Sequence, residues 1–425
     1  MKKIITIILT LALVTVFAVS MVACGNDGKK LNEVELPALE LDQPDYSELD
    51  IPSTFKIGLI CLHDETSTYD LNFINAFKDA CKELGLSKSQ YTIKVNIPEG
   101  AECEEVAKEL AAGGCKVVFA DSFGHEPYML KAAKAYPNVQ FCHATGTTAH
   151  TANQANFHNA FASIYEGRYL AGIAAGMKLN EMIAAGKFTA AEAKMGYVGA
   201  FAYAEVISGY TSFYLGAKSV CPSVTMEVQF TDSWFNPTAE EAVAKTLIAK
   251  GCKLISQHAD SMGAPTACEA AGIPNVSYNG STIEDCSNTF IVSSRINWTP
   301  YVKYIIAKTV KGEAFPADYT GSLKDGSVVL TALNGDVMAK GTVEAIVAAR
   351  AKLVKDEGKL EVFDVTKDNY ITVGGEKIDS FIADVHDYGD YVPETEVVVN
   401  GAIKESEFRS APYFNLAIDG ITKLN

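Results

Sequence analysis

The hydrophobic pattern changes period once between Lys56 and Gly85, and this change predicts the first structural unit of the chain. Residues 56–62 (KIGLICL) are almost wholly apolar, which is typical of a parallel strand buried on both faces. A polar loop follows, and from Asp70 apolar side chains recur at helical spacing: Phe73, Ala76, Phe77 and Ala80. Ligands of open α/β sheets bind beyond the carboxyl ends of the strands, so we expect residues 63–73 to form one wall of a pocket.

The same alternation of strand and helix periods continues along most of the chain. Further strands are predicted at residues 92–97, 115–120, 139–143, 195–200, 225–230, 253–257, 275–278, 290–294 and 328–333. Helices are predicted at residues 102–112, 127–135, 160–179, 206–220, 239–250, 264–271, 298–311 and 342–357. Strands that alternate with helices indicate parallel, doubly wound sheets. The tail that ends at Asn425 is rich in loops, and its periodicity does not place it.

A polar run at residues 145–154 divides the pattern into two similar series. We therefore expect an α/β protein with two Rossmann-like, doubly wound domains. The N-terminal lobe is expected at residues 54–155 plus about 298–320, and the C-terminal lobe at residues 156–297 plus about 321–425.

The first 53 residues do not share this pattern. Lys2 and Lys3 precede an apolar stretch at residues 4–19, and Met21-Val22-Ala23-Cys24 resembles a bacterial lipobox. The resemblance implies a lipoprotein signal peptide at residues 1–24, lipidation of Cys24 and attachment to the extracytoplasmic face of the cell membrane. An ordinary signal peptide, with Cys24 uninvolved, is the alternative. Residues 25–53 are rich in Asp, Glu and Pro and are expected to form a flexible acidic linker.

Charge and cysteine usage narrow the function classes. The formal net charge is −16 without an offsetting basic patch, so we expect no nucleic-acid partner. The nine cysteines after Cys24 form no Cys-x-x-Cys pair and fall mostly in strand or helix patterns, so we expect most of them to be reduced core residues. The motifs G-x-S-x-G, G-x-G-x-x-G, Walker A and H-E-x-x-H are absent. We therefore predict no catalytic residues, no cofactor and no enzyme activity.

Polar and aromatic residues gather where the predicted strands end, and these residues form the candidate binding site: Tyr69, Asp70, Phe123, His125, Glu126, Phe201, Tyr203, Glu205, His258, Asp260, Tyr278, Asn279, Asn297 and Trp298. If two sheets face one another, these residues line one cleft, where rings sandwich a flat molecule and polar groups read its edge. Any single aromatic residue of this kind can pack in the core instead of contacting a ligand. We expect Phe73 in the core and Tyr69 in the site. Trp298 can equally lock a hinge. The histidines at strand ends are too dispersed to predict a metal site.

Seven segments that follow one another in a fixed order indicate more specifically which class of protein this chain resembles. These segments are KIGLI, STYDLNFINAFKDACKELG, VVFADSFGHEPYMLKAAKAYPNVQF, GRYLAGIAAGM, MGYVGAFAYAEVISGYTSFYLGAK, ISQHADSMGAPTACEAAG and INWTPYVKYIIAKTVKGE. Over roughly residues 55–315 the chain resembles the basic-membrane-protein family, the substrate-binding lipoproteins of ABC importers that include bacterial purine-nucleoside receptors.

The resemblance implies a type I periplasmic-binding-protein fold, a hinge between the lobes, closure around a purine nucleoside or base, and ABC permease subunits as partners. It places Tyr69 at the ring that stacks on the base, Asp70 at a neighbouring asparagine, and Phe123 in the base pocket. Phe201 or Tyr203 would supply the second stacking face. Asn279 and Asn297 replace an acidic residue and a lysine that lie near the ribose, so a free base is an alternative to the nucleoside. A receptor of the same fold for a metal or another small polar molecule, and a surface sensor, also remain open.

Overall fold

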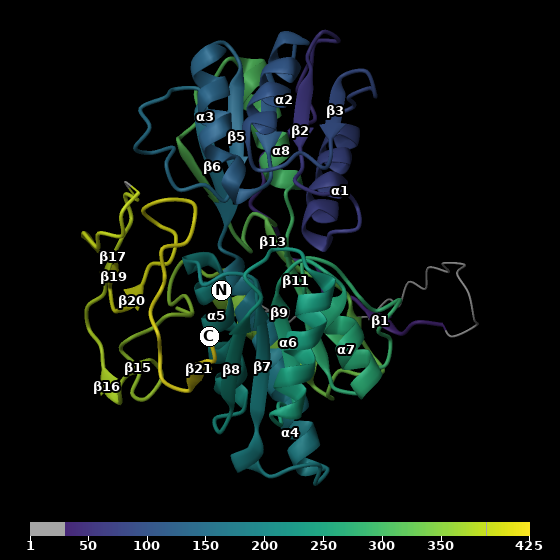
Figure 1. Ribbon diagram of the computed structural model, residues 1–425, viewed down its shortest axis with the longest axis vertical. Helices are drawn as coiled ribbons and strands as arrows, with labels where there is room; N and C mark the ends of the chain where they lie inside the picture. Colours follow the sequence, from purple (N-terminus) through teal and green to yellow (C-terminus); the bar gives the residue numbers. More distant parts are fainter. Residues whose placement is uncertain (1–29, 388) are drawn as a thin grey trace, which may run out of the picture.

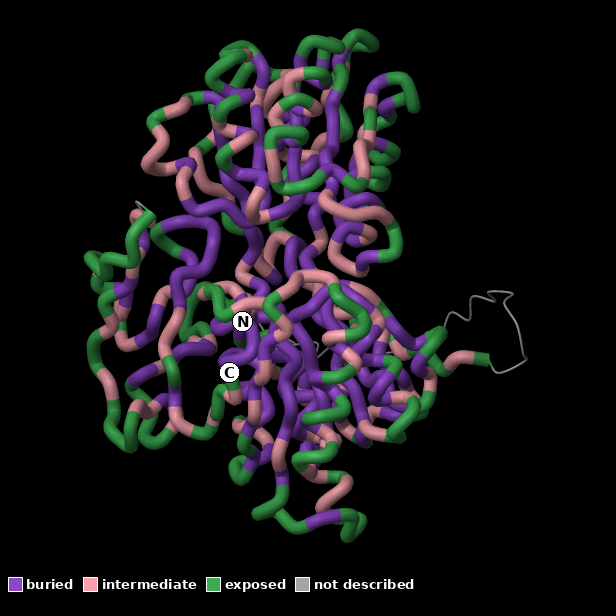
Figure 2. Tube along the Cα trace, in the orientation of Figure 1, coloured by how far each residue is buried: buried purple, intermediate pink, exposed green. Residues whose placement is uncertain are grey.

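Two mainly parallel sheets, one in each lobe, organise the chain (Figure 1). The computed structural model describes residues 30–387 and 389–425. The expected signal peptide and the lipidation of Cys24 lie outside the described residues. Figure 2 shows the sheets as buried segments at the centre of each lobe, covered by helices whose outer faces are exposed. Of the helices in this described part, none combines the length and apolar character needed to cross a bilayer.

The first lobe contains a six-stranded parallel sheet in the order β12-β6-β5-β4-β2-β3. Its strands are β2 (Ile57–Ile60), β3 (Tyr91–Lys94), β4 (Val117–Ala120), β5 (Gln140–Ala144), β6 (Phe157–Ala162) and β12 (Asp318–Gly321). Helices α1 (Thr68–Glu83) and α8 (Thr299–Lys311) pack on one face, and α2 (Ala101–Ala112) and α3 (Glu126–Ala135) on the other. Strand side chains alternate between these two cores, so Leu59 faces α1 and α8 while Ile60 faces α2 and α3.

The second lobe contains a seven-stranded sheet in the order β13-β11-β10-β9-β7-β8-β21. Its strands are β7 (Lys194–Gly199), β8 (Thr225–Phe230), β9 (Leu254–His258), β10 (Asn275–Tyr278), β11 (Phe290–Ile296), β13 (Val328–Leu330) and β21 (Ile421–Lys423), with β13 antiparallel. Helices α4 (Ile164–Ala184) and α5 (Ala204–Val220) cover one face, and α6 (Pro237–Ala249) and α7 (Gly263–Ala271) the other. Helix α9 (Thr342–Leu353) packs against α4.

Short elements complete the described chain. They are the 3-10 helices η1 (Phe123–His125) and η2 (Ala190–Glu192), and the strand pairs β1 (Glu33–Val34) with β14 (Leu333–Asn334), β15 (Thr372–Val373) with β16 (Glu376–Lys377), β17 (Ile382–Ala383) with β18 (Thr395–Glu396), and β19 (Val398–Val399) with β20 (Ala402–Ile403). The nine described cysteines are buried and free, which confirms the expectation that most are reduced core residues.

The helix predicted at residues 160–179 is wrong at its start. Residues 157–162 form β6, which pairs with β5 in the first sheet, and α4 begins only at Ile164. The chain therefore crosses to the second lobe after β6 rather than at residue 155. The alanines of this stretch favour a helix by propensity, but pairing with β5 and β12 overrides that preference.

The expected flexible linker is also wrong for the part that the structure describes. From residue 30 onward this segment lies on the folded body, where β1 pairs with β14. The backbone nitrogen of Asp42 donates a hydrogen bond to the Lys324 oxygen at 2.9 Å, and the Gln43 amide donates to the Asp325 oxygen at 2.6 Å. The segment is polar because it lies at the surface, and its backbone still finds fixed partners.

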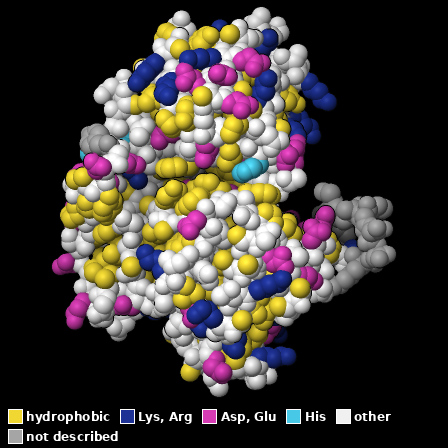
Figure 3. Space-filling view, in the orientation of Figure 1, with side chains coloured by type: hydrophobic (Ala, Val, Ile, Leu, Met, Phe, Trp, Pro, Cys, Tyr) yellow, Lys and Arg dark blue, Asp and Glu magenta, His cyan; other side chains and the backbone are white. Residues whose placement is uncertain are grey.

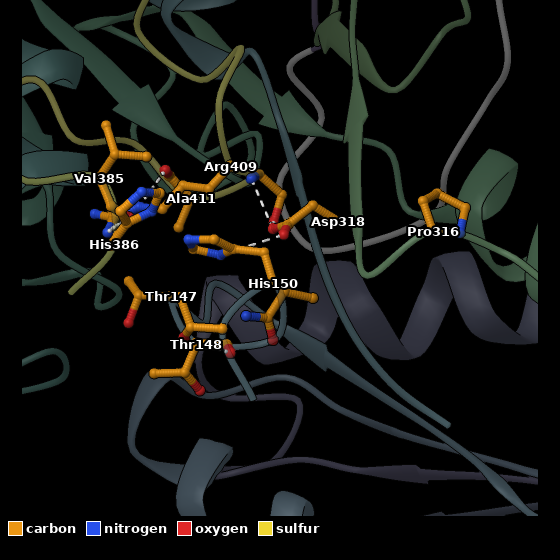
Figure 4. A network of polar contacts seen from close by, with 12 residues as sticks. Thr147, Thr148, His150, Pro316, Asp318, Val385, His386, Arg409 and Ala411 are labelled. Carbon is orange, nitrogen blue, oxygen red and sulfur yellow. Dashed lines mark hydrogen bonds and ion pairs between the residues drawn. The ribbon is translucent and has the colours of Figure 1, made fainter. Parts of the chain in front are cut away.

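The C-terminal tail, residues 359–425, connects the two lobes. It is attached to the second lobe by the pairing of β21 with β8 and by an ion pair of 3.1 Å between Lys359 and Glu166. Its middle part reaches β12 of the first lobe, where the backbone nitrogen and hydroxyl of Ser410 donate to Asp318 at 2.8 and 2.6 Å. Figure 4 shows Asp318 beside His150, whose Nδ1 lies 3.5 Å from the Asp318 carboxylate.

Replacement of Gly216 by alanine tests the close approach of α4 and α5. A Cβ at Gly216 would lie 2.0 Å from the Tyr169 oxygen of α4, and one at Gly172 would lie 2.0 Å from the Phe213 oxygen of α5. Because these contacts are with backbone atoms that cannot rotate away, we expect Gly216→Ala to lower the free energy of unfolding by about 1–3 kcal/mol. Gly100→Ala is the control, since nothing lies within 4 Å of a Cβ there. Equal losses for both variants in chemical denaturation would contradict the argument.

Candidate functional site

A narrow cavity lies between the lobes at the carboxyl ends of their strands. Its lining from the first lobe is Leu62, His63, Tyr69, Asp70, Ser122, Phe123 and Thr145, and from the second lobe Glu205, Trp234, His258, Asp260 and Tyr278. Figure 3 shows hydrophobic side chains gathered along the boundary between the lobes. The cavity volume is about 20 Å³, room for about one water molecule, so entry of a ligand requires that the lobes separate.

The start of α1 holds the first wall of this cavity. Ser67 caps the helix, and its hydroxyl accepts a hydrogen bond from the Asp70 nitrogen at 3.2 Å. The Tyr69 hydroxyl donates to the Asp121 backbone oxygen at 2.7 Å, and its ring packs 4.9 Å from that of Phe73. These contacts fix the Tyr69 ring at the cavity. Phe73 itself is fully buried, which confirms its expected place in the core.

The same helix end binds the second lobe directly. The backbone nitrogen and the hydroxyl of Thr68 both donate to the Asp260 backbone oxygen, at 3.0 and 3.1 Å. One turn further on, the Asn72 side chain donates to the Ile296 oxygen of β11 at 2.5 Å. Closure of the cleft is therefore linked to the position of Tyr69 and Asp70, which lie between these two contacts.

Aromatic rings from the second lobe form the opposite wall. The Trp234 ring lies 5.1 Å from that of Phe201 in an edge contact, and Phe201 stacks on Tyr203 at 5.1 Å. Tyr203 is 45% exposed and lies 5.5 Å from Phe123 of the first lobe, across the cleft. Trp234 lines the cavity itself, whereas Phe201 and Tyr203 support it from the outer side.

Two carboxyl groups behind Tyr69 form a pair. Burial opposes ionisation of Asp70, but hydrogen bonds from His63 and Ser67 hold its pKa below the usual value. Burial, reinforced by the neighbouring charge of Asp70, raises the pKa of Asp121 well above its usual value. These opposite shifts favour a proton on Asp121 and the negative charge on Asp70.

Cys61 lies beside this pair and could complete a metal-binding group. One possible ligand atom from each of Cys61, Asp70 and Asp121 lies within 4.8 Å of the others. Burial raises the pKa of the Cys61 thiol well above its usual value, and the charges of Asp121 and Asp70 add to this effect. Metal ligands must be deprotonated, so a metal bound here would have to displace the protons that burial favours on Cys61 and Asp121.

The part of the cavity that the second lobe forms contains a histidine and two further carboxyl groups. Burial lowers the pKa of His258. The Glu205 carboxylate, 3.3 Å from the His258 Nε2, acts in the opposite direction but has the smaller effect. The imidazole is therefore neutral near pH 7. Burial, together with the charges of Asp70, Glu240 and Glu205, raises the pKa of Asp260 well above its usual value. Tyr278 packs 4.3 Å from the His258 ring, and its hydroxyl is buried without a hydrogen-bond partner in the described structure.

The structure brings seven of the fourteen sequence-predicted site residues to the cavity: Tyr69, Asp70, Phe123, Glu205, His258, Asp260 and Tyr278. The other seven lie elsewhere. Phe201 and Tyr203 support Trp234, and His125 is buried with its Nε2 2.9 Å from the Ile97 oxygen. Glu126 accepts hydrogen bonds from the Thr147 and Thr148 nitrogens at 3.1 and 2.9 Å and so shapes the loop after β5.

The last three of these residues directly follow β10 and β11. Trp298 is 2% exposed and stacks on Phe73 at 4.4 Å, inside the core of the first lobe. The Asn297 side chain accepts from the Thr299 nitrogen at 3.2 Å and donates to the Gly326 oxygen at 3.1 Å. Asn279 is buried in a left-handed conformation with φ 60°, and its nitrogen donates to the Ser294 oxygen. The Asn297 side chain thus stabilises the turn after β11, the Trp298 ring packs in the core, and none of the three residues lines the cavity.

Five lining residues were absent from the predicted set: Leu62, His63, Ser122, Thr145 and Trp234. The first four directly follow β2, β4 and β5, so their place after a strand was the available signal. Trp234 lies in the loop after β8, where the adjacent aromatic residues Trp234 and Phe235 were the available signal.

Comparisons with known proteins agree with this arrangement. A family model described as "Bmp: ABC transporter substrate-binding protein PnrA-like" matches residues 57–363. A purine-binding protein of Brucella abortus (strain 2308) is 35% identical over 226 residues, which cover 53% of this chain and 60% of the relative. A putative ABC transporter glucose-binding protein of Haloferax volcanii is 28% identical over 257 residues, covering 60% and 62%. The chain thus spans about three-fifths of the length of these curated relatives.

Solved structures share the fold. An ABC transporter solute-binding protein from Conexibacter woesei has a TM-score of 0.58 at 20% identity, covering 72% of this chain and 98% of its own. A solute-binding protein from Aeropyrum pernix K1 has a TM-score of 0.55 at 17% identity, covering 72% and 88%. The two-lobed α/β architecture is therefore that of periplasmic binding proteins. With the family model matched over most of its length, the chain belongs to the Bmp family of ABC transporter substrate-binding proteins.

Proposed function

We propose that this protein captures a purine base in the cleft between its lobes and presents it to the permease of an ABC importer. The observation that carries the proposal is the narrow cavity, to which Tyr69 contributes from the first lobe and Trp234 and Tyr278 from the second. Aromatic walls suit a flat heterocycle, and the polar groups between them suit its edge. The purine-binding relative from Brucella abortus supports this ligand class.

The free base is favoured over the nucleoside. The resemblance places Asn279 and Asn297 where family members that bind nucleosides have charged residues near the ribose. In this chain Asn297 is engaged with Thr299 and Gly326, and neither asparagine lines the cavity. A ribose would therefore lack charged partners and would need additional space.

The mechanism is closure of two lobes around the ligand. In the closed form Thr68 binds the Asp260 backbone and Phe123 meets Tyr203, so these contacts form only when both cavity walls have met. A ligand that contacts both walls stabilises the closed form, which a permease can distinguish from the open form. Anchoring through a lipid on Cys24 would hold the receptor beside the permease at the extracytoplasmic face. No step of this cycle requires a catalytic residue or a cofactor.

Titration calorimetry with adenine, guanine, hypoxanthine, adenosine and glucose tests the ligand class. We expect heat of binding with at least one purine base and at least tenfold weaker binding of adenosine than of adenine, because the ribose lacks partners. Glucose serves as the competing ligand class, given the glucose-binding relative. Binding of glucose without binding of any purine would refute the proposal.

Substitution of Tyr69 tests the aromatic wall. We expect Tyr69→Ala to weaken binding of adenine by roughly 1–3 kcal/mol, the usual cost of removing a ring that stacks on a base. Tyr69→Phe is the matched control, since it keeps the ring and removes only the hydrogen bond to the Asp121 oxygen. If both variants bind adenine as the unmodified protein does, Tyr69 is not a stacking residue.

A further inference from the structure

The cavity is lined by acidic side chains without basic ones to balance them. Among its twelve lining residues, Asp70, Glu205 and Asp260 carry carboxyl groups, and none is lysine or arginine. The buried Arg168 lies behind this wall and donates to the Gln257 oxygen at 3.1 Å and to Ser256 at 3.2 Å, not to a carboxylate of the cavity. A carboxylate at the cavity therefore lacks a cation, and its charge must be met by hydrogen-bond donors or removed by a proton.

Asp260 differs from the other two carboxyl groups in its partners. Asp70 accepts a hydrogen bond of 2.8 Å from the His63 nitrogen, and Glu205 faces His258. The side chain of Asp260 is 6% exposed, and no hydrogen-bond donor within the described residues reaches its carboxyl oxygens. Its backbone groups are engaged instead: the oxygen accepts from Thr68, and the nitrogen donates to the Trp234 oxygen at 2.9 Å. The free hydrogen-bonding capacity of this buried side chain is directed at the cavity.

The groups that face Asp260 all favour its neutral form. They are Asp70 and Tyr69 on α1, Glu205 on α5, Glu240 on α6, His258 on β9 and Tyr278 on β10. Three of them are carboxyl groups, burial holds His258 neutral, and burial also raises the pKa of both tyrosines well above the usual value. None of these groups supplies a positive charge that would stabilise a carboxylate, and His63, the remaining ionisable residue of the lining, is paired with Asp70, with its Nδ1 3.4 Å from that carboxylate.

We propose that Asp260 is a specificity-determining residue that binds the ligand as an uncharged carboxylic acid. An uncharged acid has an O–H donor and a C=O acceptor side by side. It therefore selects a heterocycle edge that presents an acceptor and a donor side by side, as the ring nitrogen and amino group of adenine or the lactam of hypoxanthine do. An anionic heterocycle such as urate would meet Asp70 and Glu205 at close range and is excluded. This inference rests on the proposed function, which it narrows to a type of ligand edge.

Two substitutions of Asp260 separate the uncharged acid from a carboxylate. Asparagine has nearly the same shape and likewise offers one acceptor beside a donor, so we expect Asp260→Asn to bind adenine within about threefold of the unmodified protein at pH 6. Asp260→Leu removes both groups, and we expect at least a tenfold loss. Glu65→Gln, at an exposed position of the loop after β2 and outside the cavity lining, is the control for a general change of charge. Equal losses for the asparagine and leucine variants would overturn the proposal.

The pH profile of binding gives a second readout that a purely structural role would not change. The acid must keep its proton, so affinity is full at low pH and is lost as the pH rises through the raised pKa of Asp260. With uncharged adenine as the ligand, we expect the affinity to fall with rising pH for the unmodified protein and to stay constant for Asp260→Asn. Parallel profiles for the two proteins would contradict the inference.

Infrared difference spectroscopy tests the protonation state of Asp260 independently of which ligand the protein binds. The ligand-free protein at pH 7 should show the C=O stretching band of an uncharged carboxylic acid, and part of that band should disappear in Asp260→Asn. Asp121→Asn should remove a different part, since burial also raises the pKa of Asp121. If no purine binds but the Asp260 band is present, the proposed ligand is wrong and the state of Asp260 stands. If purines bind and the band is absent, the inference about Asp260 fails alone.

Discussion

The two hydrogen bonds from Thr68 to the Asp260 backbone oxygen are the contact on which the site depends. They join the first turn of α1 to the end of β9 and so bring the carboxyl ends of two separate sheets together. Tyr69 and Asp70 follow Thr68 on one side, and the Asp260 side chain extends from the other. Because parallel strands direct their carboxyl ends to one edge of each sheet, a single contact of this kind is enough to assemble aromatic and acidic groups from both lobes.

This assembly concentrates carboxyl groups in a region from which water is largely excluded. Asp70 stays ionised because hydrogen bonds from His63 and the capping residue Ser67 support its charge. Asp121 accepts a hydrogen bond from the Leu62 nitrogen at 3.1 Å, but burial and the charge of Asp70 outweigh it, and burial likewise raises the pKa of Asp260. The difference in hydrogen-bond donors, rather than in burial, thus decides which carboxyl group is charged. The same polar groups that shape the cavity therefore set its electrostatic character.

Most of the fold could be predicted from the sequence, because β2, β4 and β5 are short apolar runs followed by helices of clear periodicity. The strand β6 could not, since its alanines favour a helix and only its neighbours β5 and β12 make it a strand. Half of the site residues were predictable from their place after strands. Trp298 was not, because the sequence shows that a ring follows a strand but not that it turns into the core to stack on Phe73.

The C-terminal tail extends beyond residue 363, where the match to the family model ends. It is fixed to the second lobe through β21 and meets β12 of the first lobe through Ser410 and Asp318, so it spans the hinge from outside. Any rotation that parts the lobes must lengthen or break this span. Separation of the lobes is thus coupled to a segment that contributes no residue to the lining of the cavity.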